Sequence, residues 1–331
     1  MKKILITGGT GFIGSHLAEL CIKKGYKVTV FDRYNPNYNL GNLADSRFKE
    51  KIKFIFGDIR DYDSVNNAIK KNDIVFHLAA LIGIPYSYIS PNAYIKTNVE
   101  GTYNVLESCK NNKIKKIIIT STSEVYGSAK YIPIDEKHPL QPQSPYSASK
   151  ISADNLALSY FYSFNLPVAI IRPFNTYGPR QSQRAIIPTI INQIINSKDG
   201  NIELGNLSPT RDFSYVEDTC EAFIKFINSS KSFGKVINIG SGSQISIINL
   251  TKLIAKLMNK KIKFKKSKLR IRPKPSEVQN LCASIKIAKR ELSWKPKYHG
   301  TTGLSKGLIK TINWFRNKNK VISFSSKKYI V

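Results

Sequence analysis

The fold of this chain is decided by the stretch Thr7-Gly8-Gly9-Thr10-Gly11-Phe12-Ile13-Gly14. It follows the apolar run Lys3–Thr7 and precedes apolar residues at helical spacing, which predicts a strand, a tight turn and a helix. Its glycines match both GxGxxG and the related GxxGxxG pattern. Positions without a side chain let backbone amides reach a pyrophosphate at a helix N-terminus. We therefore predict a dinucleotide-binding unit whose contacts include Gly8, Gly11, Phe12, Ile13 and Gly14.

An acidic residue, Asp32, ends the next predicted strand, Lys27–Asp32. A carboxylate at this position accepts a hydrogen bond from an adenosine ribose hydroxyl and repels a 2′-phosphate. It therefore favours NAD over NADP, although the neighbouring Arg33 weakens that preference.

Strand-like runs alternate with helical patterns through the first half of the chain, which predicts βαβ units and a parallel sheet. The further expected strands are Lys53–Gly57, Ile74–Ala79, Lys116–Ser121, Val168–Arg172, Val236–Ile239 and 261–266. The helices expected later in the chain are 183–196, 247–258 and 304–317. The predicted fold class is α/β, with a doubly wound parallel Rossmann sheet and a smaller C-terminal α/β substrate-binding domain. We expect residues 1–175 to form the NAD-binding domain, with a returning segment at about 212–242, and residues 176–331 to form mainly the substrate-binding domain.

Two elements predict the chemistry. In Tyr146-Ser147-Ala148-Ser149-Lys150, the tyrosine and the lysine lie four apart on a predicted helix and share one face. The ammonium is therefore expected to lower the pKa of the Tyr146 phenol, so that the phenolate accepts a proton from a sugar hydroxyl while a nicotinamide takes the hydride. The run Ser121-Thr122-Ser123-Glu124 adds a carboxylate, which indicates that a second proton, on carbon, is also removed.

The composition excludes several other classes. The formal charge is +30, and nine of the fifteen residues from Lys260 to Lys274 are Lys or Arg. No zinc spacing, arginine-rich arm or aromatic RNA-binding signature accompanies this run, so we expect no nucleic-acid partner. It is interpreted either as a field that steers a diphosphate-bearing substrate or as a solvated lysine face.

Cysteines, histidines and apolar runs indicate the cellular compartment and whether a metal or a membrane span is expected. The four cysteines are far apart in sequence, which favours a reducing compartment, and no histidine has metal-ligand spacing, so no metal is expected. No apolar run reaches the roughly eighteen residues of a membrane span, and no signal segment precedes the first strand. We expect a cytoplasmic protein with no membrane span.

These motifs together resemble the extended short-chain dehydrogenase/reductase family. The resemblance continues through Arg172-Pro173-Phe174-Asn175-Thr176-Tyr177-Gly178-Pro179-Arg180 and Arg211-Asp212-Phe213-Ser214-Tyr215-Val216. Members bind NAD tightly and act on nucleotide-diphospho-sugars. The resemblance implies cofactor contacts from Asp58, Ile59, Leu78, Ala79, Ala80 and Asn98, together with Tyr146 and Lys150. It also implies substrate contacts from Asn175, Arg180, Arg211 and Arg272.

Within the family, the tripeptide at 122–124 separates the chemistries, and here it is Thr122-Ser123-Glu124. The 4,6-dehydratases carry Thr-Asp-Glu or Thr-Ser-Glu, the glucuronate decarboxylases carry Thr-Ser-Glu, and the 4-epimerases usually have no carboxylate there. The implied reaction passes a hydride from C4 to NAD, removes the C5 proton with Glu124, expels water from C5–C6 and returns the hydride to C6. Because Ser123 is too weak an acid to protonate the leaving hydroxyl, Glu124 would also serve as the acid. The alternatives are a 4-epimerase, a UDP-glucuronate decarboxylase and a non-enzymatic regulator that binds NAD or a sugar nucleotide.

Three further segments are most similar to the nucleotide-sugar 4,6-dehydratases of the legionaminic-acid pathway. These segments are Ile84–Tyr88, Pro179–Ser182 and Arg272–Val278. The resemblance implies a nucleotide-linked hexose or N-acetylhexosamine substrate, such as GDP- or UDP-N-acetylglucosamine, and a role in surface polysaccharide biosynthesis. Two helices, near 98–109 and from Ser144 onward, carry apolar residues on more than one side, which predicts pairing with their mates in a homodimer.

Overall fold

The computed structural model describes residues 1–267 and 273–318 of the chain. Its centre is a sheet of seven strands in the order β11-β6-β5-β4-β1-β2-β3, and every neighbouring pair is parallel. The strands are β1 (Lys3–Thr7), β2 (Lys27–Arg33), β3 (Ile52–Gly57), β4 (Ile74–His77), β5 (Lys116–Thr120), β6 (Val168–Pro173) and β11 (Val236–Ile239). The strand order reverses between β1 and β4, as in a Rossmann sheet. The predicted doubly wound α/β fold is confirmed.

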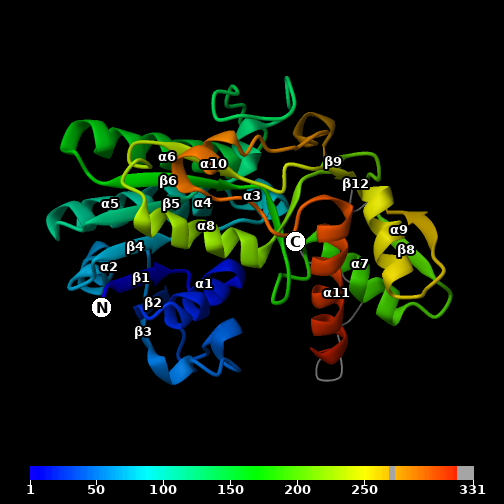
Figure 1. Ribbon diagram of the computed structural model, residues 1–331, viewed down its shortest axis with the longest axis horizontal. Helices are drawn as coiled ribbons and strands as arrows, with labels where there is room; N and C mark the ends of the chain where they lie inside the picture. Colours follow the sequence, from blue (N-terminus) through cyan, green and yellow to red (C-terminus); the bar gives the residue numbers. More distant parts are fainter. Residues whose placement is uncertain (268–272, 319–331) are drawn as a thin grey trace.

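Helices cover both faces of this sheet (Figure 1). Helices α1 (Phe12–Lys23) and α8 (Val216–Asn228) pack on one face, and α2 (Tyr62–Ile69), α5 (Gly101–Asn111) and α6 (Pro145–Phe164) pack on the other. Side chains alternate between the two cores along each strand, so that Ile118 of β5 lies in one core while Ile117 and Ile119 lie in the other. Burial on both faces explains why the strands are continuous apolar runs.

The second half of the chain adds a smaller lobe beside the sheet, on the right of Figure 1. Its main elements are α7 (Ile186–Asn196), β8 (Asn201–Leu204), α9 (Ile247–Leu257), β13 (Lys263–Lys266) and α11 (Gly300–Lys318). Short strand pairs connect it to the sheet: β7 (Asn175–Tyr177) with β10 (Phe213–Tyr215), and β9 (Thr210–Arg211) with β12 (Ile245–Ser246). Helix α10 (Lys286–Leu292) returns to the sheet beside β11. The domain boundary at residue 175 stays a prediction.

Some element ends differ from the predicted ones. Strand β4 ends at His77 rather than Ala79. The Leu78 amide still donates to the Thr7 carbonyl, at 3.1 Å, but the Ala79 amide donates to the Thr7 hydroxyl instead, at 3.2 Å. The helix expected near 98–109 begins earlier, with a π-helical turn, η3 (Ile95–Glu100), before α5. Helix α7 begins at Ile186 rather than at residue 183.

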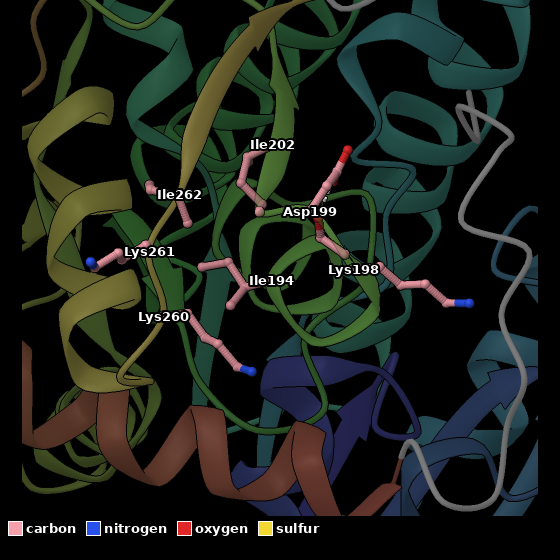
Figure 2. Close-up of a pocket in the computed structure, with 9 residues that line it drawn as sticks. Ile194, Lys198, Asp199, Ile202, Lys260, Lys261 and Ile262 are labelled. Carbon is pink, nitrogen blue, oxygen red and sulfur yellow. Dashed lines mark hydrogen bonds between the residues drawn. The ribbon is translucent and has the colours of Figure 1, made fainter.

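A surface pocket of about 270 Å³ lies in the smaller lobe (Figure 2). It is lined by the end of α7, by β8 and by the segment between α9 and β13, with Ile194 and Ile202 beside Lys198, Lys260 and Lys261. None of the predicted site residues lines it.

One lysine ties α8 to the sheet. The Lys116 amine, at the start of β5, donates to three carbonyl oxygens at the end of α8, those of Phe226, Ile227 and Ser229, at 2.8–3.0 Å. A cation among the last carbonyls of a helix satisfies their hydrogen-bonding capacity and opposes the negative end of the helix dipole. Partial burial lowers the pKa of Lys116.

We predict that Lys116→Met lowers the free energy of unfolding by roughly 1–3 kcal/mol, since three carbonyls lose a charged donor. The control is Lys115→Met, because that side chain is 79% exposed and forms a surface ion pair with Asp73. Its effect should stay within about 0.5 kcal/mol. Denaturant titration of both variants measures the difference. Equal stabilities would show that the Lys116 contacts do not anchor α8.

Candidate active site

The glycine turn between β1 and α1 is shaped by close contacts at three of its four glycines. Gly8 has φ +70°, and a Cβ there would lie 2.8 Å from the Ala79 amide nitrogen. A Cβ on Gly9 would lie 2.6 Å from the Val30 side chain, and one on Gly14 only 2.3 Å from the Gly8 carbonyl oxygen. These glycines are required by the packing of the turn itself.

Gly11 differs from the other three. It is exposed and is the N-cap residue of α1, with φ −71° and ψ −174°, and a Cβ at this position would have the Gly8 carbonyl oxygen as its nearest neighbour, at 3.2 Å. Packing restricts this position less than the other three, since the single contact would require a shift of only a few tenths of an ångström. A side chain at this N-cap would lie beside the first N–H groups of α1. The arrangement fits a pyrophosphate that approaches the helix N-terminus at Gly11.

Asp32 supports the same turn from β2. Its Oδ2 accepts hydrogen bonds from the amide and hydroxyl of Thr10, at 2.8 and 2.6 Å, and its Oδ1 accepts from the Arg33 amide. The carboxylate therefore positions the turn, and its contact with a ribose stays a prediction. Thr10 lies inside the glycine motif, but the glycine spacing carries no signal for its role.

The loop after β4 is held from beneath by Asn98. This side chain is fully buried; its Oδ1 accepts from the Leu81 amide, and its Nδ2 donates to the Leu81 carbonyl and to Ser149 Oγ, at 2.9–3.0 Å. Leu78, Ala79 and Ala80 lie above it, partly exposed. Asn98 thus positions the predicted cofactor loop, and a direct contact with NAD stays a prediction.

Sequence reasoning assigned His77 no role, but the structure places it in a buried chain of hydrogen bonds. Its Nδ1 lies 2.8 Å from Thr7 Oγ1, and its Nε2 lies 3.1 Å from Thr102 Oγ1. Because the Thr7 hydroxyl accepts from the Leu78 and Ala79 amides and the Thr102 hydroxyl donates to the Asn98 carbonyl, the chain is satisfied by a neutral His77 with its proton on Nε2. Burial, followed by the charge of Lys150, lowers the pKa of His77 to about 3.

The predicted catalytic residues come together at the carboxyl ends of β5 and β6. Thr122 caps the short helix η4 (Ser123–Tyr126), and its hydroxyl accepts from the Glu124 amide at 3.2 Å. Tyr146 stands in the first turn of α6, hydrogen-bonds to Thr122 and is near enough to Glu124 to feel its charge. The predicted start of α6 is confirmed, since Ser144 caps the helix in a capping box with Ser147.

The expected effect of Lys150 on Tyr146 is not seen among the described residues. Burial raises the pKa of the Tyr146 phenol well above its usual value, and the hydrogen bond with Thr122 opposes this effect only in part. Lys150 instead donates to the Thr120 carbonyl at 2.6 Å, and burial lowers its pKa to about 8. Desolvation of the phenol therefore dominates the pKa of Tyr146, and a lowering effect of Lys150 stays a prediction.

Three other predicted residues are buried or paired with protein groups. Ser123 is buried at 3% exposure, beneath the surface that Thr122 and Glu124 present. Asp58 forms a two-pronged pair with Arg60 at the end of β3, and Ile59 is buried beside it. Hydrogen bonds from Arg60 lower the pKa of Asp58.

The predicted substrate residues are held by protein partners. Asn175 donates to the Asp212 carbonyl at 3.4 Å. Arg211 is buried, donates to the Thr210 carbonyl and lies 3.5 Å from Glu277. Arg180 pairs with Glu19 of α1 at 2.8 Å, which ties it to the Rossmann helix. Arg272 lies outside the described residues.

A cation outside the predicted site residues, Arg184, lies near Tyr94, which packs against Tyr146. The ring of Tyr146 packs edge-on against Tyr94, whose hydroxyl donates to the Gly83 carbonyl. The charge of Arg184 reaches Tyr94, and its guanidinium lies 3.8 Å from the position that a Gly83 Cβ would take. Within residues 1–267 and 273–318, no group of three His, Cys, Asp or Glu side chains could hold a metal ion, and none of the helices found there is long and apolar enough to cross a membrane.

Comparison with known proteins decides the family. Residues 5–306 match the model of the GDP-mannose 4,6 dehydratase family. The chain belongs to this family, within the extended short-chain dehydrogenases/reductases. The dTDP-D-glucose 4,6-dehydratase of Dictyostelium discoideum is 40% identical over 77% of the chain, a match that spans 62% of that relative's length.

Other members of the family carry out a different reaction. The putative UDP-glucose 4-epimerase of Methanocaldococcus jannaschii is 33% identical and matches 96% of the chain and 99% of its own length. The structure of UDP-glucuronic acid 4-epimerase from Bacillus cereus, in complex with UDP-glucuronic acid and NAD, superposes with a TM-score of 0.85 at 32% identity, over 95% of this chain and 99% of that one. The relatives of the chain are thus nucleotide-sugar 4,6-dehydratases and 4-epimerases.

Gly11→Ala should leave the fold intact but raise the Kd for NAD on the order of tenfold or more, because the methyl group covers the first turn of α1. Gly14→Ala is the contrasting variant, since its methyl overlaps the Gly8 carbonyl and should destabilise the turn itself. Calorimetric titration with NAD and thermal melting separate the two effects. Wild-type affinity in the folded Gly11 variant would place the pyrophosphate elsewhere.

Proposed function

We propose that this chain is an NAD-dependent nucleotide-sugar 4,6-dehydratase. The observation that carries the proposal is a carboxylate, Glu124, beside the tyrosine that an epimerase or a dehydratase needs alike. A 4-epimerase exchanges hydride only at C4 and has no use for a base at C5. The dehydratase relatives and the carboxylate support the same reaction.

The residues of the site divide the proton transfers of this reaction among them. Bound NAD would supply the hydride acceptor and, after elimination, the hydride donor. Tyr146 must be the phenolate at this step to take the proton of the C4 hydroxyl, and Thr122 holds its oxygen by a hydrogen bond, which opposes the effect of burial on its pKa. The C4 ketone acidifies the C5 proton, which Glu124 removes.

Glu124 also returns a proton to the departing C6 hydroxyl. Ser123 is a weak acid, and its burial keeps it away from the sugar. Glu124 becomes a carboxylic acid when it takes the C5 proton, and it is then the proton donor for the C6 hydroxyl. One side chain thus acts first as base and then as acid.

We propose a nucleotide-linked hexose or N-acetylhexosamine as substrate, such as GDP- or UDP-N-acetylglucosamine. Incubation of the pure protein with a panel of UDP-, GDP- and dTDP-sugars, followed by mass spectrometry, tests this. Loss of water supports the dehydratase, whereas loss of CO₂ or an unchanged mass with an inverted C4 centre rejects it. Binding of NAD or sugar without any conversion would favour the regulator.

A second candidate acts on a uronic acid, as a decarboxylase or a 4-epimerase. The observation that favours it is Arg184, whose guanidinium lies beside the loop that carries Tyr94 and Gly83 and is suited to a sugar carboxylate. The relative that binds UDP-glucuronic acid agrees with this alternative.

We also propose a cytoplasmic location and a role in surface polysaccharide biosynthesis. The absence of disulfides among the described cysteines agrees with a reducing compartment: Cys21, Cys109, Cys220 and Cys282 are all free.

A homodimer through α5 and α6 is a further proposal. These helices expose three large side chains, Tyr103, Tyr162 and Phe164, of which Tyr162 is 73% exposed. We expect light scattering to give the mass of a dimer, and Tyr162→Lys to weaken it. Tyr34→Lys, a change of equal charge at a tyrosine that is 66% exposed elsewhere, should have no effect. A monomeric wild type would contradict the proposal.

The sharpest prediction concerns Glu124→Gln, which keeps shape and hydrogen bonding but accepts no proton. Oxidation at C4 should continue while elimination falls by about 10²–10⁴-fold, so NADH absorbance should appear without the 4-keto-6-deoxy product. Tyr146→Phe is the matched control, because it should abolish both signals.

Wild-type turnover in heavy water should also place deuterium at C5 of the product. Elimination at the wild-type rate in the Glu124 variant would reject Glu124 as the base.

A further inference from the structure

The face of α6 that carries Tyr146 and Lys150 has a third buried polar residue one turn further along the helix. Tyr146, Lys150 and Asp154 follow one another at four-residue spacing, and all three are buried. Residues four apart on a helix have Cβ atoms about 5–6 Å from each other. Asp154 is therefore the neighbour of Lys150 on the side away from Tyr146.

Asp154 is held by two groups from neighbouring strands. Its Oδ2 accepts from Nε and Nη2 of Arg172, at 3.0 and 2.9 Å, and from the hydroxyl of Ser121 at 2.7 Å. Arg172 also donates to the Tyr126 hydroxyl and lies 5.0 Å from the centre of that ring. Arg172 opens the Arg172–Arg180 motif, and neither the cofactor nor the substrate contacts proposed above use it.

The other oxygen of this carboxylate is unsatisfied. Asp154 Oδ1 is inaccessible to solvent and accepts no hydrogen bond within the part of the chain described. Three donors thus converge on one oxygen, while the second oxygen of the same carboxylate accepts none within the described residues. An arrangement that served only to bury Arg172 would be expected to use both oxygens in a two-pronged pair.

Lys150 needs an opposing charge. Its side chain is 3% exposed, and its amine donates to a neutral carbonyl, that of Thr120. The charged or titratable groups around it are Asp154 on α6 and His77 on β4, with Tyr146 one turn away on α6 and Arg172 of β6 behind Asp154. His77 is neutral and Tyr146 is protonated in this environment, and Asp154 is the charged group that acts on Lys150 directly.

We propose that Asp154 is a positioning residue whose buried carboxylate, anchored by Arg172 and Ser121, keeps the Lys150 amine protonated at neutral pH. Burial lowers the pKa of Lys150 because it disfavours the ammonium, and a nearby anion raises that pKa again. Loss of the anion makes Lys150 release its proton at a lower pH. The consequence for turnover rests on the proposed function, whereas the charge of Lys150 itself does not.

The test measures the titration of Lys150 directly. In protein labelled with ¹³C-lysine, the ε-methylene resonance missing from Lys150→Arg identifies Lys150, and its shift is followed with pH. We expect a wild-type midpoint near the pKa of about 8 that burial and Asp154 together set. Asp154→Asn should move this midpoint down by roughly one pH unit or more.

Ser121→Ala is the matched control, because it removes one hydrogen bond from Asp154 and keeps the charge. Its midpoint should equal that of the wild type. Should Asp154→Asn fail to fold because Arg172 is left buried without its partner, the pair Asp154→Asn with Arg172→Met removes both charges. Asp154 is the charge that raises the pKa of Lys150, so this pair should also show a lowered midpoint.

An unchanged midpoint in the folded Asp154 variant, or in the paired variant, overturns the proposal and leaves Asp154 as part of the scaffold. The pH profile of turnover provides the catalytic readout: its alkaline limb should move to lower pH with the same variants. If no nucleotide sugar is converted, the proposed function fails while the resonance still reports the charge of Lys150.

Discussion

The site depends on one hydrogen bond, from the Lys150 amine to the carbonyl of Thr120 at 2.6 Å. Thr120 is the last residue of β5, and the chain that leaves this strand carries Thr122 and Glu124. Lys150 is one turn from Tyr146 on α6. The bond therefore fixes the tyrosine against the carboxylate even though some twenty residues of irregular chain separate them. A lysine buried so fully must keep both this acceptor and a counter-charge, which constrains β5, β6 and α6 together.

The parallel sheet explains why these groups meet at all. All seven strands point the same way, so every loop that leaves a carboxyl end reaches the same edge. The glycine turn leaves β1, Asp32 ends near the tip of β2, the loop of Ala79 leaves β4, and Glu124 follows β5. The buried side chain of Asn98 then fixes the loop after β4 through its hydrogen bonds to the Leu81 backbone.

Sequence alone predicted the fold well because its signals are local. The strand β1 and the capped start of α6 coincide with the predicted residues, since apolar runs and Ser-Pro caps act over a few positions. The site was predicted less completely, because its partners are remote in sequence. Arg180 is paired with Glu19 across 161 positions, a contact that no motif spacing encodes. Likewise, the raised pKa of Tyr146 follows from burial, which the four-residue spacing to Lys150 cannot report.

The two carboxylates near the catalytic pair show how environment separates roles. Glu124 is only partly buried and follows a strand end, where a substrate can reach it. Asp154 is fully buried and is anchored by a guanidinium and a hydroxyl, so it can hold a charge but cannot exchange a proton with a sugar. In the proposed reaction, environment would assign proton transfer to one acid and a fixed electrostatic field to the other, as in enzymes whose paired carboxylates differ in solvation. A base for carbon is needed only if the hydride step prepares an elimination, and a protonated lysine is needed for the hydride step itself. The arrangement of the two acids therefore matches the order of the two chemical steps.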